Sequence, residues 1–123
     1  MPKKRSDAAD ASLPLAPAIF QILVALADQD RHGYAIMQDV AGRTAGRTKL
    51  SPGTLYGSIK RMLEDGLVVE IDERPDPDND DERRRYYRLT PFGRAVAQAE
   101  ADRLTTLLRQ ARAAGLAPRR STP

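Results

Sequence analysis

The 123-residue chain contains no cysteine and no tryptophan, and its single histidine is His32. The absence of cysteine excludes disulfides, thiolate nucleophiles and thiolate metal sites. One histidine with no plausible nucleophile beside it offers no catalytic triad, so we expect no enzyme activity, no cofactor and no metal. No apolar run reaches the roughly 18 to 20 residues that a bilayer span needs, and residues 1–12 lack the apolar stretch of a secretory signal. We therefore expect a soluble, cytoplasmic protein with no membrane partner.

Aromatic residues are also scarce, at 5% of the chain, so the core must be built mainly from Leu, Ile, Val and Ala. This composition favours a helical domain. The charge balance is weakly basic, with 20 Lys and Arg against 17 Asp and Glu. A net charge of +3 is compatible with nucleic acid but does not indicate it, so the distribution of the charges matters more than their sum.

The spacing of apolar residues predicts three helices in the first half of the chain. The residues recur at intervals of three and four in the segments 14–27 and 33–42, as in amphipathic helices. A third helix begins at Ser51, an N-cap residue, with Pro52 at the first helical position. Gly66 ends it. Its predicted buried stripe is Leu55, Ile59, Met62 and Leu63.

A β-hairpin and a long helix are predicted in the second half. The segments 67–71 and 85–89 have the β-branched or alternating character of strands, and a long polar loop joins them. Thr90 caps a final helix that starts at Pro91 and runs to about Ala114. The expected fold class is mainly α with a β-hairpin wing (α+β), that is, a winged helix-turn-helix followed by a C-terminal dimerisation helix.

Four parts follow from this order. Residues 1–12, with Lys3, Lys4 and Arg5, are expected to form a flexible basic tail, and residues 115–123 a second flexible tail. Residues 13–90 form the winged helix-turn-helix domain. Residues 91–114 form the dimerisation helix.

The third helix is the candidate recognition helix. With its apolar stripe turned to the core, small residues near its start and cations near its end face solvent, and its free N–H groups favour phosphate. The hairpin contributes cations on its returning strand. The candidate DNA-binding residues are Ser51, Pro52, Gly53, Thr54, Tyr56, Ser58, Lys60, Arg61, Lys49, Arg84 and Arg85. Each of these residues alone is explained equally well as a helix cap or a solvated side chain. Only their combination indicates binding to double-stranded DNA.

Four motifs in order carry a resemblance to a known family. They are HGY at 32–34, LSPGTLY at 50–56, EDGL at 64–67, and YYRLTP at 86–91 followed by Gly93 and Arg94. Over roughly residues 13–110 the chain resembles the PadR family of transcriptional regulators, in the short type with a single C-terminal helix. The resemblance implies a winged-helix repressor that binds a palindromic operator as a homodimer and is released by a small-molecule effector.

Two features depart from the family pattern. Gly57 and Ser58 stand where the family commonly has Pro and an apolar residue, which makes the middle of the recognition helix more flexible. The wing carries seven acidic residues against two arginines over 72–83, so phosphate should repel its tip. Asp76, Asp78 and Asp80 imitate a calcium loop, but the loop lacks the glycine and the glutamate that it needs later, so we favour an open solvated loop.

The final helix has an apolar stripe that a complete winged-helix domain cannot cover alone, although packing on the first helix could contribute. The candidate dimerisation residues are Val96, Ala97, Leu104, Leu107, Leu108 and Ala111.

His32 is interpreted as a cap or packing residue rather than a pH sensor, and Tyr34 as mostly core. Tyr56 could equally pack at the core edge or contact phosphate. The rival function is a protein-interaction module that uses the acidic wing and the third helix without reading DNA.

Overall fold

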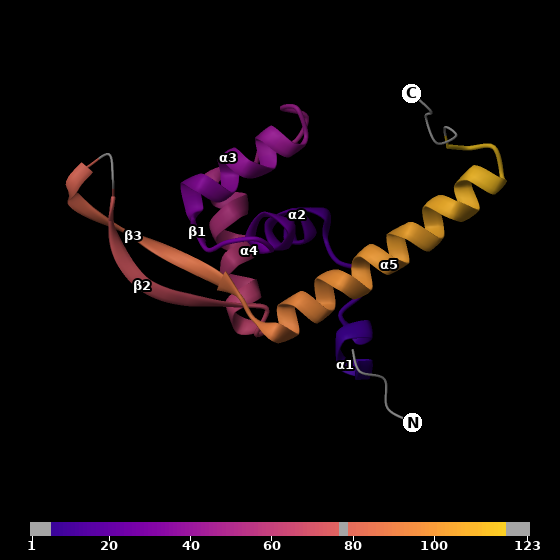
Figure 1. The fold of residues 1–123 in the computed structure, drawn as a ribbon, viewed down its shortest axis with the longest axis horizontal. Coiled ribbons are helices and arrows are strands. Elements are labelled where there is room, and N and C mark those ends of the chain that lie inside the picture. The colour runs from indigo at the N-terminus through magenta and orange to yellow at the C-terminus, as the bar shows by residue number, and fades with distance from the viewer. Residues whose placement is uncertain (1–5, 77–78, 118–123) are drawn as a thin grey trace.

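The computed structural model of the chain describes residues 6–76 and 79–117, excluding the side chains of residues 6–7 and 72–84. The helices are α1 (Ser6–Ala11), α2 (Pro17–Leu26), α3 (Gly33–Arg43), α4 (Pro52–Glu64) and α5 (Pro91–Ala113). The strands are β1 (Arg31–His32), β2 (Val68–Asp76) and β3 (Asn79–Leu89). The hairpin projects from one side of the helical body and α5 from the other (Figure 1). The predicted fold class is confirmed.

The core lies where α2, α3 and α4 meet the base of the hairpin. The predicted stripe of α2, Ile19, Ile22, Leu23 and Leu26, is buried, and Ile36 and Val40 of α3 and Leu55, Ile59 and Met62 of α4 pack into the same cluster. Each fully buried aliphatic side chain stabilises the fold by about 1.5–3 kcal/mol. The prediction was wrong for Leu63, which is 37% exposed. It lies one residue beyond Met62, so it is turned too far round the helix to reach the core.

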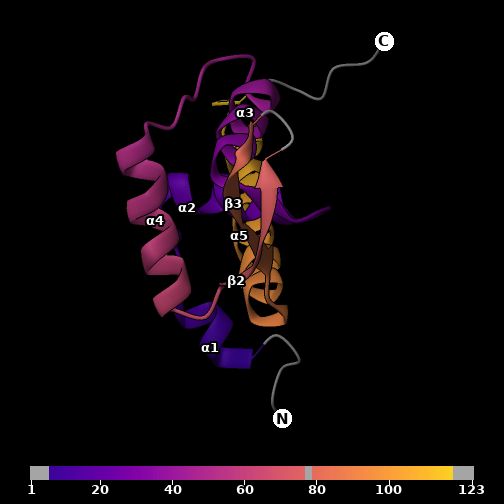
Figure 2. The ribbon, with the colours of Figure 1, turned by 90° about the vertical axis from the view of Figure 1, so that its left-hand side faces the viewer.

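The sheet has three strands, in the antiparallel order β1-β3-β2. The sequence did not predict β1, whose two residues pair with Tyr86 and Tyr87 of β3. The hairpin strands also extend further than predicted, because their backbones remain extended to Asp76 and from Asn79 where a long loop was expected. Figure 2 shows α4 beside this hairpin. The side chains of the acidic wing, including the three aspartates of the calcium-loop pattern, lie outside the described residues.

The start of α5 is joined tightly to the turn between α4 and β2. The Thr90 hydroxyl accepts a hydrogen bond from the Gly93 N–H at 2.8 Å, as an N-cap should, and donates to the Gly66 carbonyl at 2.7 Å. The Thr90 N–H donates to the Leu67 carbonyl at 3.1 Å. Any side chain at position 93 would collide with that same carbonyl, so glycine is required there. The predicted cap at Thr90 is confirmed.

The N-terminal segment differs from its prediction. Residues 6–11 form α1, which packs against α5 and buries Ala9 completely, where a flexible tail was expected. The small residues of this segment allow a close approach between helices that polarity alone does not reveal. Lys3, Lys4 and Arg5, and the tail beyond residue 117, lie outside the described residues. Within the described part of the chain, every helix is too short or too polar to cross a membrane.

The two halves of α5 have different surroundings. Its buried residues, Gly93, Val96, Ala99 and Glu100, all lie in the first half, which packs on α1, α2 and β3. The second half extends away from the body and exposes Leu104, Leu107 and Leu108 at 38%, 47% and 43%. The prediction that Val96 faces a second chain was therefore wrong, because its side chain is fully buried in its own domain.

Candidate nucleic-acid interface

The first turn of α4 has the predicted cap. The Ser51 hydroxyl oxygen accepts a hydrogen bond from the Thr54 N–H at 3.1 Å, and the Ser51 hydroxyl donates to Thr54 Oγ1 at 3.1 Å. Pro52 has no N–H, so the Gly53 N–H is the open donor of this turn among the described residues. A built Cβ at Gly53 meets no atom within 4 Å. The turn can therefore approach an anion closely through one backbone donor at the positive end of the helix.

One face of α4 is uncovered by the rest of the chain. Thr54, Gly57 and Lys60 are exposed, whereas Leu55, Ile59 and Met62 are buried on the opposite side. Gly57, like Gly53, has open space around it. Ser58 is half-buried toward the edge of this face. The face therefore combines two bare backbone positions with a cation further along, which suits contact with a polyanion.

Tyr56 lies at the side of α4 that faces α3. Its hydroxyl and ring edge rest over Gly33, the first residue of α3, where any Cβ would overlap them. The ring is still 49% exposed, so Tyr56 serves as a packing residue and leaves a surface for a ligand. Tyr34 is 51% exposed, and its interpretation as mostly core was wrong. It follows Gly33 on α3 and points away from the buried residues Ile36 and Val40.

His32 links α3 to the wing. Its Nδ1 accepts a hydrogen bond from the Ala35 N–H at 3.1 Å, and its ring meets Tyr86 edge to face, with centroids 5.3 Å apart. The interpretation of His32 as a cap and packing residue is confirmed. Because His32 also belongs to β1, the start of α3 and strand β3 form one unit. The HGY motif was the signal for this link in the sequence, because the spacing of apolar residues in α3 does not account for a histidine at its start.

The cations around α4 have unequal surroundings. Lys49 is exposed in the loop before α4, and the Thr48 N–H anchors this loop by donating to the Thr44 hydroxyl at 3.0 Å. Arg85 is 63% exposed on β3, with its Nε 3.6 Å from the Glu70 carboxylate of the neighbouring strand. Glu70 therefore offsets part of its charge. The Arg84 side chain lies outside the described residues.

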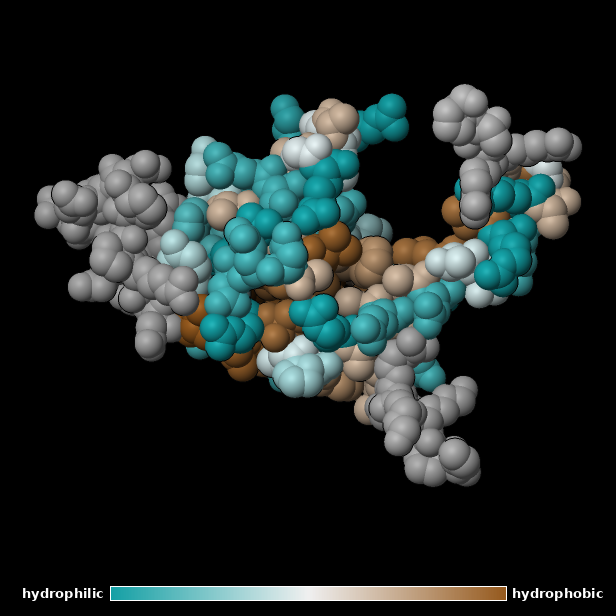
Figure 3. All heavy atoms as spheres, viewed as in Figure 1, coloured by the Kyte–Doolittle hydropathy of each residue, from teal (hydrophilic) through white to brown (hydrophobic). Residues whose placement is uncertain are grey.

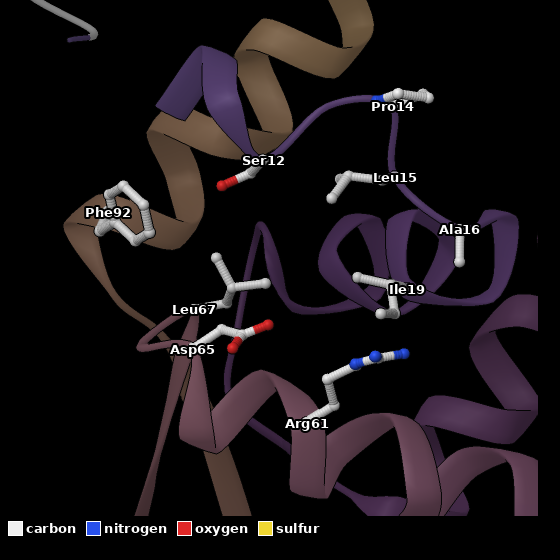
Figure 4. A pocket seen from close by; sticks show the side chains of 9 residues that line it. All are labelled: Ser12, Pro14, Leu15, Ala16, Ile19, Arg61, Asp65, Leu67 and Phe92. Atoms are coloured by element: carbon white, nitrogen blue, oxygen red, sulfur yellow. The ribbon is translucent and has the colours of Figure 1, made fainter. Parts of the chain in front are cut away.

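Arg61 is exposed like Lys60, but it lines a cavity at the side of α4 that faces α2. Its side chain extends from α4 toward Ile19 of α2 and lines a cavity there (Figure 4). Of the predicted DNA-binding residues, Ser51, Gly53, Thr54 and Lys60 lie on the exposed surface of α4 and its N-cap. Tyr56 and Arg61 lie on its two flanks.

Two arginines that the sequence suggested only as motif residues hold the domain together. The Arg88 guanidinium donates two hydrogen bonds to the Asp30 carboxylate, at 3.1 and 2.8 Å, between β3 and the loop after α2. This pairing holds the pKa of Arg88 above its ordinary value. The Arg94 guanidinium donates to the Ala27 carbonyl at 2.8 Å. The single loop between α2 and β1, residues 27–30, is therefore fixed by two motif arginines with a structural role.

Three helices in which the last has an open, capped face, followed by an antiparallel hairpin beside that helix, define a winged-helix protein. Solved structures show the same fold. A PadR family transcription regulator from Clostridium difficile superposes with a TM-score of 0.66 at 23% identity, covering 79% of this chain and 96% of that one. A transcriptional regulator from Clostridium thermocellum superposes with a TM-score of 0.64 at 22% identity, covering 76% of this chain and 84% of that one.

Residues 22–99 match the transcriptional regulator PadR-like family, and the chain belongs to it. The transcriptional regulator Rv3488 of Mycobacterium tuberculosis is 36% identical over 89 residues, which are 72% of this chain and 77% of that protein. An uncharacterized 37.1 kDa protein in transposon TN4556 of Streptomyces fradiae is 36% identical over 89 residues as well. That match is 70% of this chain but only 22% of the Streptomyces protein. The predicted family resemblance is confirmed.

Proposed function

We propose that the chain is a sequence-specific DNA-binding transcriptional regulator that reads a palindromic operator as a homodimer, with α4 as its recognition helix. The observation that carries this proposal is the uncovered face of α4, where the open Gly53 N–H, the Thr54 hydroxyl and Lys60 lie together. A helix with this face fits the major groove, and its first turn fits a phosphate. Family membership supports the same function.

The dimer would form through α5. Its exposed Leu104, Leu107 and Leu108 continue into an apolar groove of about 180 Å³ between α2 and the first half of α5. Ala97 lies in this groove, and Figure 3 shows apolar surface gathered in the hollow between α2 and the projecting part of α5. Two copies related by a two-fold axis would cover these surfaces and separate the recognition helices by roughly 34 Å, one turn of DNA.

In this proposal the dimer occupies an operator over a promoter and blocks the polymerase, and a small-molecule effector releases it. Phosphates dominate such a complex, so its affinity must depend steeply on salt. With about six to ten phosphate contacts, affinity falls roughly a thousand-fold or more between about 50 and 200 mM salt.

An electrophoretic shift with the DNA upstream of the chain's own coding region, repeated across this salt range, tests the proposal. A shifted band that weakens steeply with salt is the expected result. No shift at low salt, or a complex that salt does not weaken, would contradict it. A scrambled DNA of the same length is the control for sequence specificity.

A further inference from the structure

A cavity of about 570 Å³ lies between the recognition helix and the segment that precedes α2. Figure 4 shows Ser12 and Leu15 of this segment on one side, and Arg61 and Asp65 rising from the end of α4 on the other. The volume falls within the roughly 300–1,000 Å³ typical of small-molecule sites. The full lining comprises Ser12, Pro14, Leu15, Ala16, Ile19, Arg61, Asp65, Leu67 and Phe92.

Two opposite charges enter this cavity from a single helix turn. Arg61 and Asp65 are four residues apart, so their side chains leave α4 on the same side, with Cβ atoms about 5–6 Å apart. No ion pair or hydrogen bond joins either side chain to another residue in the part of the chain that the structure describes. Leu15, Ile19, Leu67 and Phe92 supply apolar surface around them.

We propose that this cavity binds a small amphoteric molecule with an apolar body, of the class of α-amino acids with an apolar side chain. The carboxylate of such a ligand would pair with the Arg61 guanidinium, and its ammonium group with the Asp65 carboxylate. A plain organic acid would meet Asp65 as a like charge, and a plain amine would meet Arg61, so neither satisfies the site. The apolar body would cover Leu15, Ile19 and Phe92.

The wall opposite α4 is held in place by α5. Glu100 is buried, its carboxylate accepts two hydrogen bonds from Arg103 at 2.7 Å each, and it also interacts with the Leu15 backbone N–H. Ser12 donates a hydrogen bond to the Ala8 carbonyl of α1 at 3.2 Å. The cavity is thus built before a ligand arrives, which reduces the entropy lost on binding.

The position of the cavity makes it suitable for an effector. Arg61 lies in the last turn of α4 and Asp65 is the C-cap of the same helix, so occupancy would engage the helix that is proposed to read DNA. This regulatory consequence rests on the proposed function, whereas binding itself does not. The ligand is therefore tested without DNA, and the two proposals can fail separately.

Isothermal titration calorimetry of the full chain with L-phenylalanine, near neutral pH, tests the inference. We expect saturable binding of one molecule per chain. 3-Phenylpropionate lacks the ammonium group and 2-phenylethylamine lacks the carboxylate, so each should bind at least about tenfold more weakly, the effect of losing one charged pair. No saturable binding of L-phenylalanine, or equal binding of all three probes, would overturn the proposal.

Two variants locate the site. Arg61→Gln and Asp65→Asn should each weaken L-phenylalanine binding at least about tenfold. Each should also reduce the difference in affinity between L-phenylalanine and the two other probes. Both residues are exposed, so the fold should tolerate the changes, and circular dichroism checks this. Arg109→Gln and Glu64→Gln remove the same charges from exposed positions outside the cavity and should bind as the unmodified chain does. Unchanged binding by Arg61→Gln would place the ligand elsewhere and overturn the assignment.

Discussion

The Tyr56 hydroxyl lies directly over the backbone of Gly33, at a position that the Cβ of any other residue would occupy. This contact sets how closely α4 approaches the start of α3. Because His32 pairs α3 with the wing through β1, the same contact connects the recognition helix to the hairpin. The HGY motif and the tyrosine of LSPGTLY therefore form one packing arrangement, although 22 residues lie between Gly33 and Tyr56 in the sequence.

Gly33→Ala should displace Tyr56 and destabilise the domain by about 1–3 kcal/mol, the usual cost of overpacking. Chemical denaturation measures this free energy of unfolding. Gly57→Ala is the matched control, because its surroundings are open, and it should stabilise α4 by about 0.5–1 kcal/mol. In a Gly33→Ala chain, Tyr56→Ala should recover part of the lost stability. A Gly33→Ala chain as stable as the original would show that Tyr56 can move at no cost.

Lys60→Ala should weaken binding to all DNA sequences. Each phosphate contact contributes about 0.9 to the slope of log affinity against log salt, so removing Lys60 from both chains of a dimer should reduce that slope by about 1.8. Arg61→Ala should reduce it less, because Arg61 is directed toward Ile19. Fluorescence anisotropy across a salt series measures both slopes. Equal slopes for the two variants would contradict the assignment of Lys60 to the DNA groove and of Arg61 to the cavity.

Leu107→Glu should prevent dimer formation without unfolding the chain. Leu107 is 47% exposed in the single chain, so a dimer would lose about half of the roughly 1.5–3 kcal/mol of full burial at each of two leucines. The dissociation constant of the dimer should then rise at least about tenfold. Sedimentation velocity measures it. Arg109→Glu, an exposed position off the apolar stripe, should leave the dimer intact. A dimeric Leu107→Glu chain would mean that another surface joins the copies.

Glu100 should make stability depend on acid. The hydrogen-bonded Arg103 guanidinium holds the pKa of the Glu100 carboxyl below its ordinary value, and the Leu15 N–H acts in the same direction, while burial opposes both. A pKa that is lower in the folded state stabilises the protein above the unfolded value of about 4.5. This stabilisation is lost as the pH falls through the pKa that Glu100 has in the folded protein.

Glu100→Gln should therefore cost about 1–3 kcal/mol near neutral pH, and the difference from the unmodified chain should shrink below about pH 4.5. Unfolding free energies across this pH range provide the measurement. Glu64→Gln, at an exposed position, should show a much smaller difference at neutral pH. If the Glu100→Gln difference were independent of pH, the charge of Glu100 would not be the cause.

Local signals predicted the elements that depend on local chemistry. Ser51-Pro52 and Thr90-Pro91 each mark a helix start, and both hydroxyls cap as expected. Gly66 ends α4 with a φ of 76°, a conformation that suits glycine. The buried stripes of α2 and α4 followed from helical spacing, except at Leu63.

The failures depend on partners distant in the chain. Strand β1 has only two residues, and its partners in β3 lie more than 50 positions away, so no local pattern could reveal it. The burial of Ala9 requires α5. Val96 has the spacing of a dimer stripe, but helical spacing cannot tell whether the same chain or a second one covers a residue.

A single residue, Thr90, separates the end of β3 from the start of α5, and its side chain and backbone are both bonded to the preceding turn. There is no flexible linker between the wing and the helix that is proposed to join two copies. In such a dimer, the fold would fix the distance and the angle between the two recognition helices. One extra base pair between the half-sites of the operator rotates one half-site by about a tenth of a turn relative to the other. The dimer should then bind this operator more weakly, although the bases that it contacts are unchanged.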